Sequence, residues 1–189
     1  MRLTSGRKEP CKNNIGGIKH LYLATWVSYD VRTIVGYRDL LVTSFPVTQI
    51  YEFKGQDITL TETLNEDGSY TQDISIKLTS QDLSSAQVLS ILMKNKVFAI
   101  TVDYLGNNRI SGIVNGMDVE VTANGGGSKV DFNGYDVALK GQEEFKSPFV
   151  NDLEGAGLTD KTQTYGCILA SSSKPASLSN KVSDCNVIL

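Results

Sequence analysis

Two groups of side chains in this sequence are of types that perform acid–base chemistry. His20 is the only histidine among 189 residues, and histidine is the commonest general base because it titrates near neutral pH. It lies inside an apolar stretch without a serine or cysteine motif beside it, so we interpret it as structural. Asp118 and Glu120 share one predicted strand face, as paired glycosidase carboxylates could. The sequence around them supplies no apolar pocket to raise one pKa, so we interpret them as solvated.

The remaining motifs complete no catalytic, metal or nucleotide site. Cys11, Cys167 and Cys185 are widely spaced and lack the C-x-x-C steps of a zinc site. We interpret them as free thiols, with a Cys167–Cys185 disulfide as the alternative in an oxidising medium. The glycine run 125–127 joins two predicted strands and opens no helix, and the motif beginning at Gly155 lacks the third glycine of a dinucleotide fingerprint. The sequence therefore predicts no enzyme, no cofactor and no metal site.

Five aromatic side chains are of the kind that stack on sugars or nucleic-acid bases. They are Tyr22, Trp26, Tyr51, Phe53 and Tyr70. Because they fall within the apolar pattern of predicted strands, we interpret them as packing residues. The alternative stays open that the chain is a monomeric β-sandwich binding module, such as a carbohydrate- or receptor-binding domain, with Trp26 or the tyrosines as its platform.

The composition is that of an ordinary globular domain. Apolar residues make up 40% of the chain and charged residues 21%, and the formal net charge is −3. This charge, without a long Lys/Arg run, argues against tight DNA binding through phosphate neutralisation. No apolar run of about 7–15 residues follows the basic start, so no signal peptide is expected. We therefore expect the chain to be made in the cytosol. No stretch of about 18 apolar residues occurs, so no membrane partner is expected.

Alternation with a period of two predicts strands through the first half of the chain. They are expected at residues 18–26, 47–53, 58–61 and 70–78. In the second of these, Val47, Tyr51 and Phe53 are expected to share one face around Gln49. In the fourth, an inner face is predicted for Tyr70, Ile74, Ile76 and Leu78.

One segment predicts a helix. Asp82 is a suitable N-cap for residues 83–93, and the apolar residues there recur at helical spacing. The inward stripe is expected to contain Ala86, Leu89, Leu92 and Met93.

The second half again predicts strands. Both faces of 97–103 are apolar, which favours a central strand. Asn115-Gly116 is a strong type I′ hairpin signal, so a meander is expected over 96–104, 109–114 and 117–123. After the glycine-rich loop, a further strand is predicted with Tyr135, Val137 and Leu139 facing the core.

A chain of this length suits one domain. We expect an N-terminal arm at 1–17, a β-sandwich or open barrel with one flanking helix near 82–95 at 18–158, and a polar C-terminal arm at 159–189. The arm carries one apolar burst, Cys167-Ile168-Leu169, and is expected to order by docking on another molecule.

Several sequence segments resemble those of small structural proteins of tailed bacteriophages, especially the tail-tube-like ring proteins of crAss-like gut phages. They are CKNNIGGIK at 11–19 followed by LYLA at 21–24, SYTQ at 69–72, FAITVD at 98–103 followed by Gly106 and the 109–116 strand, and YDVALKGQEE at 135–144. They span about residues 11–150, and none is a catalytic motif. The arm from 159 onward departs from the short C-terminus of a minimal tube protein.

The resemblance implies a β-sandwich with a flanking helix, whose copies form a ring stacked in the phage tail. The implied partners are further copies, other tail or portal-proximal ring proteins, and DNA that passes through the channel, with or without cargo protein, but is not bound specifically. The implied location is the virion tail, after synthesis in the host bacterial cytoplasm.

Two hypotheses follow for individual residues. The acidic face with Asp118, Glu120 and Thr122 is expected to line the channel, where weak repulsion keeps DNA sliding. The burst at Cys167, Ile168 and Leu169 is expected to contact a neighbouring ring.

Overall fold

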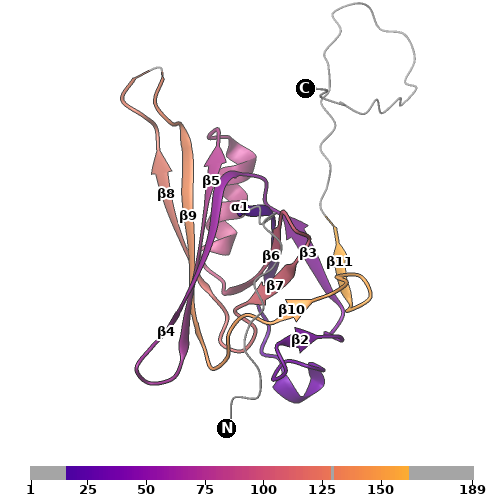
Figure 1. Ribbon diagram of the computed structural model, residues 1–189. Coiled ribbons are helices and arrows are strands. Elements are labelled where there is room, and N and C mark those ends of the chain that lie inside the picture. Colours follow the sequence, from indigo (N-terminus) through magenta and orange to yellow (C-terminus); the bar gives the residue numbers. More distant parts are fainter. Residues whose placement is uncertain (1–15, 129, 162–189) are drawn as a thin grey trace, which may run out of the picture.

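The computed structural model describes residues 16–128 and 130–161, and this part of the chain is mainly β, with 48% strand and one α-helix (Figure 1). The strands are β1 (Ile18–Thr25), β2 (Leu41–Val42), β3 (Thr48–Glu52), β4 (Gln56–Leu64), β5 (Tyr70–Thr79), β6 (Val97–Asp103), β7 (Asn108–Ser111), β8 (Asp118–Asn124), β9 (Gly134–Glu143), β10 (Phe149–Val150) and β11 (Leu158–Asp160). The helix α1 spans Leu83–Leu92, and a 3-10 turn spans Val31–Thr33. All three cysteines and the burst at 167–169 lie outside the described residues.

The strands form two sheets. Seven make a sheet curled into a half-barrel, in the order β11-β3-β1-β6-β7-β10-β2. The other four make a fully antiparallel sheet in the order β4-β5-β9-β8. We call them the curled sheet and the four-stranded sheet. The expectation of a mainly β fold with a flanking helix is confirmed.

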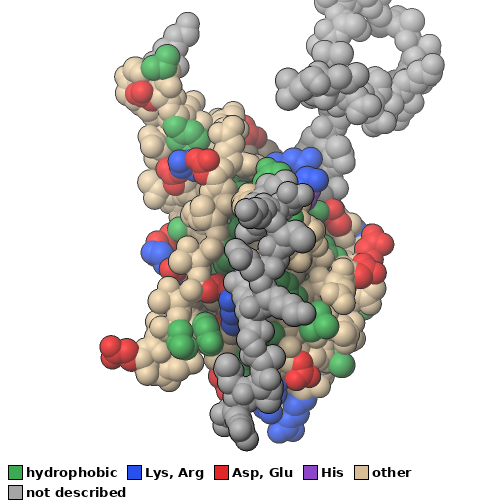
Figure 2. Space-filling view, viewed as in Figure 1, with side chains coloured by type: hydrophobic (Ala, Val, Ile, Leu, Met, Phe, Trp, Pro, Cys, Tyr) green, Lys and Arg blue, Asp and Glu red, His purple; other side chains and the backbone are tan. Residues whose placement is uncertain are grey.

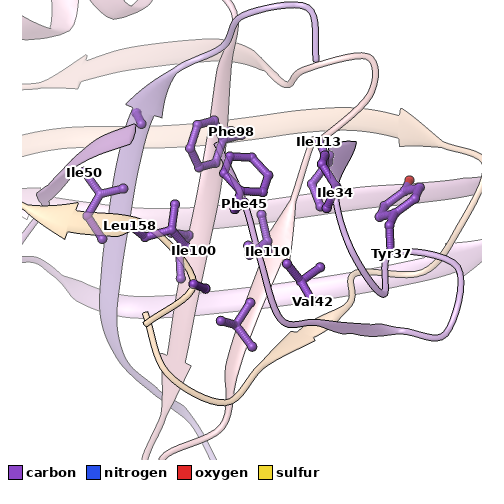
Figure 3. Close-up of a cluster of buried hydrophobic side chains, with 13 residues drawn as sticks. Ile34, Tyr37, Val42, Phe45, Ile50, Phe98, Ile100, Ile110, Ile113 and Leu158 are labelled. Carbon is purple, nitrogen blue, oxygen red and sulfur yellow. The ribbon is translucent and has the colours of Figure 1, made fainter. Parts of the chain in front are cut away.

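A separate core lies on each face of the curled sheet. In β6, Phe98 and Ile100 enter one cluster, while Val97 and Ala99 enter the other. The first cluster lies within the curl. It includes Leu158 of β11 and Val42 of β2, which come from opposite edges of the sheet; Leu158 lies beside Ile100 and Val42 beside Ile110 (Figure 3). Because β6 contributes to both clusters, the prediction of a central strand is confirmed.

The second core lies between the two sheets. Leu21 and Leu23 of β1 oppose the inner faces of β5, β8 and β9, and Leu89 of α1 closes the cluster. Ile74 and Ile76 are 1% and 2% exposed, which confirms the face predicted for β5. Val137 and Leu139 are buried as predicted on β9.

The helix begins where the sequence places it. The Asp82 side chain accepts a hydrogen bond from the Ser85 N–H at 3.4 Å, which confirms the N-cap. Leu89 is buried and Leu92 packs partly against the core. The inward position expected for Met93 is wrong, since this side chain is 49% exposed. It follows the last helical residue, where the chain turns away from the core towards β6.

The structure shows which face of β3 is buried. Ile50 is the buried residue, while Val47 and Tyr51 are 87% and 45% exposed. Both faces of this segment carry apolar side chains, so alternation alone does not choose between them. The tertiary structure determines the buried face, because the curled sheet closes around Ile50 in the first core.

The predicted meander is corrected in its second half. β6 and β7 pair, but β8 pairs with β9 in the other sheet. Asn115-Gly116 therefore carries the chain from one sheet to the other, and only Gly116, at φ +70°, has the positive φ that a type I′ turn needs at both positions. The chain crosses the end of β6 here, where Met117 bridges to Val97. This contact fixes the path in place of a hairpin.

The described body continues to the end of β11, two residues beyond the boundary expected at 158. Leu158, Thr159 and Asp160 extend the curled sheet by pairing in parallel with β3. Leu158 is fully buried, so the last strand is anchored in the first core.

A buried carboxylate holds the crossover between the sheets. Glu143, at the end of β9, is 2% exposed. Its Oε1 accepts hydrogen bonds from the N–H groups of Val114 at 3.0 Å and Asn115 at 2.9 Å. The Tyr37 hydroxyl also bonds to this carboxylate, and burial raises the pKa of both groups. One side chain of the four-stranded sheet thus satisfies donors from the crossover and from the loop beneath the first core.

Glu143→Ala should lower the free energy of unfolding by about 2–4 kcal/mol, because the part-buried N–H groups of Val114 and Asn115 and the Tyr37 hydroxyl lose their acceptor. Glu143→Gln should cost less, because its amide oxygen can still accept. Burial raises the folded-state pKa of Glu143 above 4.5, so folding favours its proton. Wild-type stability relative to Glu143→Gln should therefore fall as the pH rises from 4.5 through the raised pKa. Urea denaturation between about pH 4 and 8 checks this, and an increase with pH would contradict it.

Candidate assembly surface

The outer face of the four-stranded sheet, which points away from the curled sheet, is polar across all four strands. Pairing aligns its side chains in rows. The rows are Thr61, Asp73, Lys140 and Asp118; then Thr59, Ser75, Ala138 and Glu120; then Lys77, Asp136 and Thr122. Alternation predicts this directly, since every inward neighbour on β5, β8 and β9 is turned to the core. The surface contains no large apolar side chain in these rows.

Ion pairs connect the rows. Lys140 Nζ lies 2.8 Å from Glu120 Oε2, and Lys77 Nζ lies 2.9 Å from Asp57 Oδ2. A hydrogen bond from each ammonium group, followed by the charge of its carboxylate partner, raises the pKa of both lysines. Figure 2 shows charges of both signs interspersed over these strands. Exposed pairs of this kind contribute little to stability, so the reason for this pattern lies elsewhere.

The balance of charge on this face is acidic. Carboxylates come from Asp57, Asp73, Asp118, Glu120 and Asp136. Ammonium groups come from Lys77 and Lys140, with Lys96 3.9 Å from Asp118 at the margin. Five negative charges thus meet three positive ones among the described residues. Asp118, Glu120 and Thr122 are exposed together, as the sequence predicts, but lysines on neighbouring strands partly neutralise the two carboxylates.

The two edge strands of this sheet are long, and no strand within residues 16–128 and 130–161 pairs with their outer edges. β4 has nine residues and β8 has seven, and neither contains proline or lysine. By contrast, the curled sheet ends in β11 and β2, with three and two residues. Long edges without these residues are templates for pairing with another chain. Two strands separate β4 from β8 in this antiparallel sheet, so β4 and β8 run in opposite directions. β8 of one copy can therefore continue the antiparallel pattern at β4 of the next.

The other residues considered for chemistry do not gather into one site. His20 Nδ1 lies 2.6 Å from Glu52 Oε1, between β1 and β3. It belongs to the curled sheet, whereas Asp118 and Glu120 stand on the other sheet. Within the described residues, no three His, Cys, Asp or Glu side chains are placed to share a metal ion.

Trp26 is not a free stacking platform. Its indole N–H donates to the Ile113 carbonyl at 3.0 Å, and the ring packs against the first core. A Cβ on Gly116 would come within 2.9 Å of the indole Cγ, so the Gly116 backbone lies close against the ring. The indole is thus held by its edge and by a neighbouring loop.

Comparison with known proteins finds no match to this chain among protein-family models, curated proteins or solved structures. In residues 16–128 and 130–161, no helix combines the length and the apolar character that crossing a bilayer requires.

Sequence reasoning found the acidic face on β8 but missed its lysine partners. Lys77, Lys140 and Asp136 stand on strands that are adjacent only in the folded sheet. The alternation that exposes them is readable in the sequence, but their order across the sheet is not. The open edges were equally hidden, because the predicted meander placed β8 beside β7.

Proposed function

We propose that this chain is a structural subunit of a phage tail, of the tail-tube-like type, which assembles side by side into a ring around a channel. The observation that carries the proposal is the four-stranded sheet, with its polar outer face and two long open edges. A subunit that works by assembly needs complementary edges and no active site.

The edges favour a ring over a two-fold dimer. Pairing of β8 with β4 joins two different surfaces, and such head-to-tail contacts repeat until the rotation closes. Each added copy would contribute four strands to one continuous antiparallel wall. The backbone groups left open on β4 and β8 would then be hydrogen-bonded throughout.

The outer face suits the wall of a channel for DNA. A net negative surface does not gain affinity from releasing phosphate counterions, so DNA would pass without being held. Lysines paired with carboxylates keep the repulsion weak. In this proposal Asp118, Glu120 and Thr122 line the channel, and other tail or portal-proximal rings stack above and below.

Light scattering and negative-stain images of the purified full chain should show rings or tubes. A strict monomer at high concentration would instead favour a binding module. The edge contact itself can be tested by cross-linking in a parent with its three cysteines replaced by serine. Glu120→Cys combined with Thr59→Cys, Thr61→Cys or Thr63→Cys should give, in one register, a ladder of covalent oligomers on a non-reducing gel.

A matched control uses Glu120→Cys with Ser75→Cys. Ser75 is on the same face, but β5 is an inner strand, so no neighbouring copy's edge can reach it. Within one chain the two positions are separated by β9, beyond the Cα distance of about 7 Å that a disulfide allows. Ladders of equal strength in control and edge pairs would contradict pairing at the edges.

Reversing the charge of the proposed wall should create DNA binding. Rings with Asp118→Lys and Glu120→Lys should retain double-stranded DNA at low salt, with retention that falls steeply as salt is added. The control carries Asp30→Lys and Asp39→Lys, two exposed reversals in the loop before β2. Electrophoretic mobility of a short duplex measures both. Equal retention by the two variants would show that total charge, and not this face, determines binding.

The segment from 162 onward, after β11, is proposed to reach a neighbouring ring through Cys167, Ile168 and Leu169. Truncation after Lys161 keeps β11 and should reduce stacks to single rings in negative-stain images. Stacks of unaltered length would contradict this role.

A further inference from the structure

The solvent-facing side of α1 carries several large apolar side chains. Leu83, Val88 and Ile91 are 76%, 42% and 62% exposed, and Met93, directly after the helix, is 49% exposed. On the inner side only Leu89 is fully buried. Residues 83–93 contain no charged side chain. The exposed Ser84 and Gln87 lie between these apolar side chains. We call this uncharged, largely apolar surface the α1 face, and it is suited to a contact with another molecule.

The α1 face lies at the end of the sheet where the edge strand β4 begins. α1 follows β5 after a three-residue link, and this end of β5 pairs with the start of β4, with Lys77 opposite Gln56. Leu89 belongs to the core between the sheets, so α1 packs on the inner side of the four-stranded sheet. A stable interface needs about 800 Å² from each partner, more than one short helix presents. The occupant therefore has to contact a neighbouring element too, and β4 is in place for this.

The chain itself carries a complementary surface. On β8, Val121 is half-buried and Ala123 is exposed, on the same face as the buried Val119. Within the four-stranded sheet, this part of β8 lies beside β9, with Val121 opposite Val137 and Ala123 opposite Tyr135, and the loop that follows extends past the other strands (Figure 1). This part of β8 also belongs to the α1 end of the sheet, because Asn124 pairs with Gly134, and Gly134 pairs with Thr79.

We infer that the inner side of one copy's β8–β9 hairpin, at Val121 and Ala123, packs on the α1 face of the next copy. The inference rests on the proposed ring. When β8 of one copy extends the sheet at β4 of the next, the inner sides of both sheets continue each other. The apolar side of the hairpin then comes to the side of the sheet where α1 lies, and at the same end. The two surfaces differ, so the contact is head-to-tail. It is made by the same neighbouring copy as the edge pairing and adds buried area to that interface.

Two exposed positions allow a charge-complementation test. Ile91→Lys on the α1 face and Ala123→Glu on the hairpin leave the buried core unaltered, so circular dichroism and thermal melting should match wild type. Each variant alone should lower the fraction of chain in rings at least about tenfold, because a single charge enters an apolar contact without a partner. The double variant, which carries both substitutions in one chain, should restore assembly, because the lysine of each copy then contacts the glutamate of a neighbouring copy. Val27→Lys, at a 58% exposed loop residue, is the control and should assemble normally.

Light scattering separates this inference from the proposal beneath it. Rings of wild type together with undiminished rings of both single variants would overturn the α1 contact and leave the ring intact. A wild-type chain that stays monomeric would overturn both. Loss in both single variants without recovery in the double variant would show that the two surfaces do not meet, and would also overturn the inference.

Discussion

The buried carboxylate of Glu143 fixes the point at which one chain becomes two sheets. It accepts hydrogen bonds from Val114 and Asn115, where the chain leaves the curled sheet, and bonds to Tyr37 in the loop beneath the first core. Beside it, Gln72 on β5 accepts a hydrogen bond from the Gly112 N–H at 2.9 Å. Burying a charge is expensive, and here several donors compensate it at once. Together with the Met117–Val97 bridge and the packing of β8 in the second core, this anchor directs β8 away from β7 and onto β9.

Sending β8 to the second sheet determines what each sheet can do. The curled sheet has a core on both faces, so its apolar surface is largely buried within the subunit. Its edge strands are short, so they offer little backbone for pairing with another chain. The four-stranded sheet has a core on one face only. Its other face is free to be polar, and its long edge strands β4 and β8 are free to pair. In the proposed ring this sheet carries the edge contacts, and the α1 face lies on its inner side at the end where the next copy is proposed to dock.

A surface of this kind requires no catalytic group. The lone histidine is paired with Glu52 on the curled sheet, and the carboxylates of β8 stand beside lysines from neighbouring strands. Neither arrangement presents an apolar pocket in which a pKa could be tuned for proton transfer. The charges on the outer face are instead of both signs and exposed, with a small excess of negative charge, which is compatible with the proposed channel wall.

The sequence by itself determined the local features: most strands, the N-cap at Asp82, the buried face of β5 and the exposure of Asp118, Glu120 and Thr122. Each depends on neighbours within a few positions, which periodicity and side-chain chemistry report directly. Only the tertiary structure decided that Ile50 and not Tyr51 faces inward, that Asn115-Gly116 crosses between sheets, and that Lys140 stands beside Glu120. These depend on which strands become neighbours. That choice is made by the packing of two cores and by one buried carboxylate, 28 residues along the chain from the Asn115 backbone that it holds.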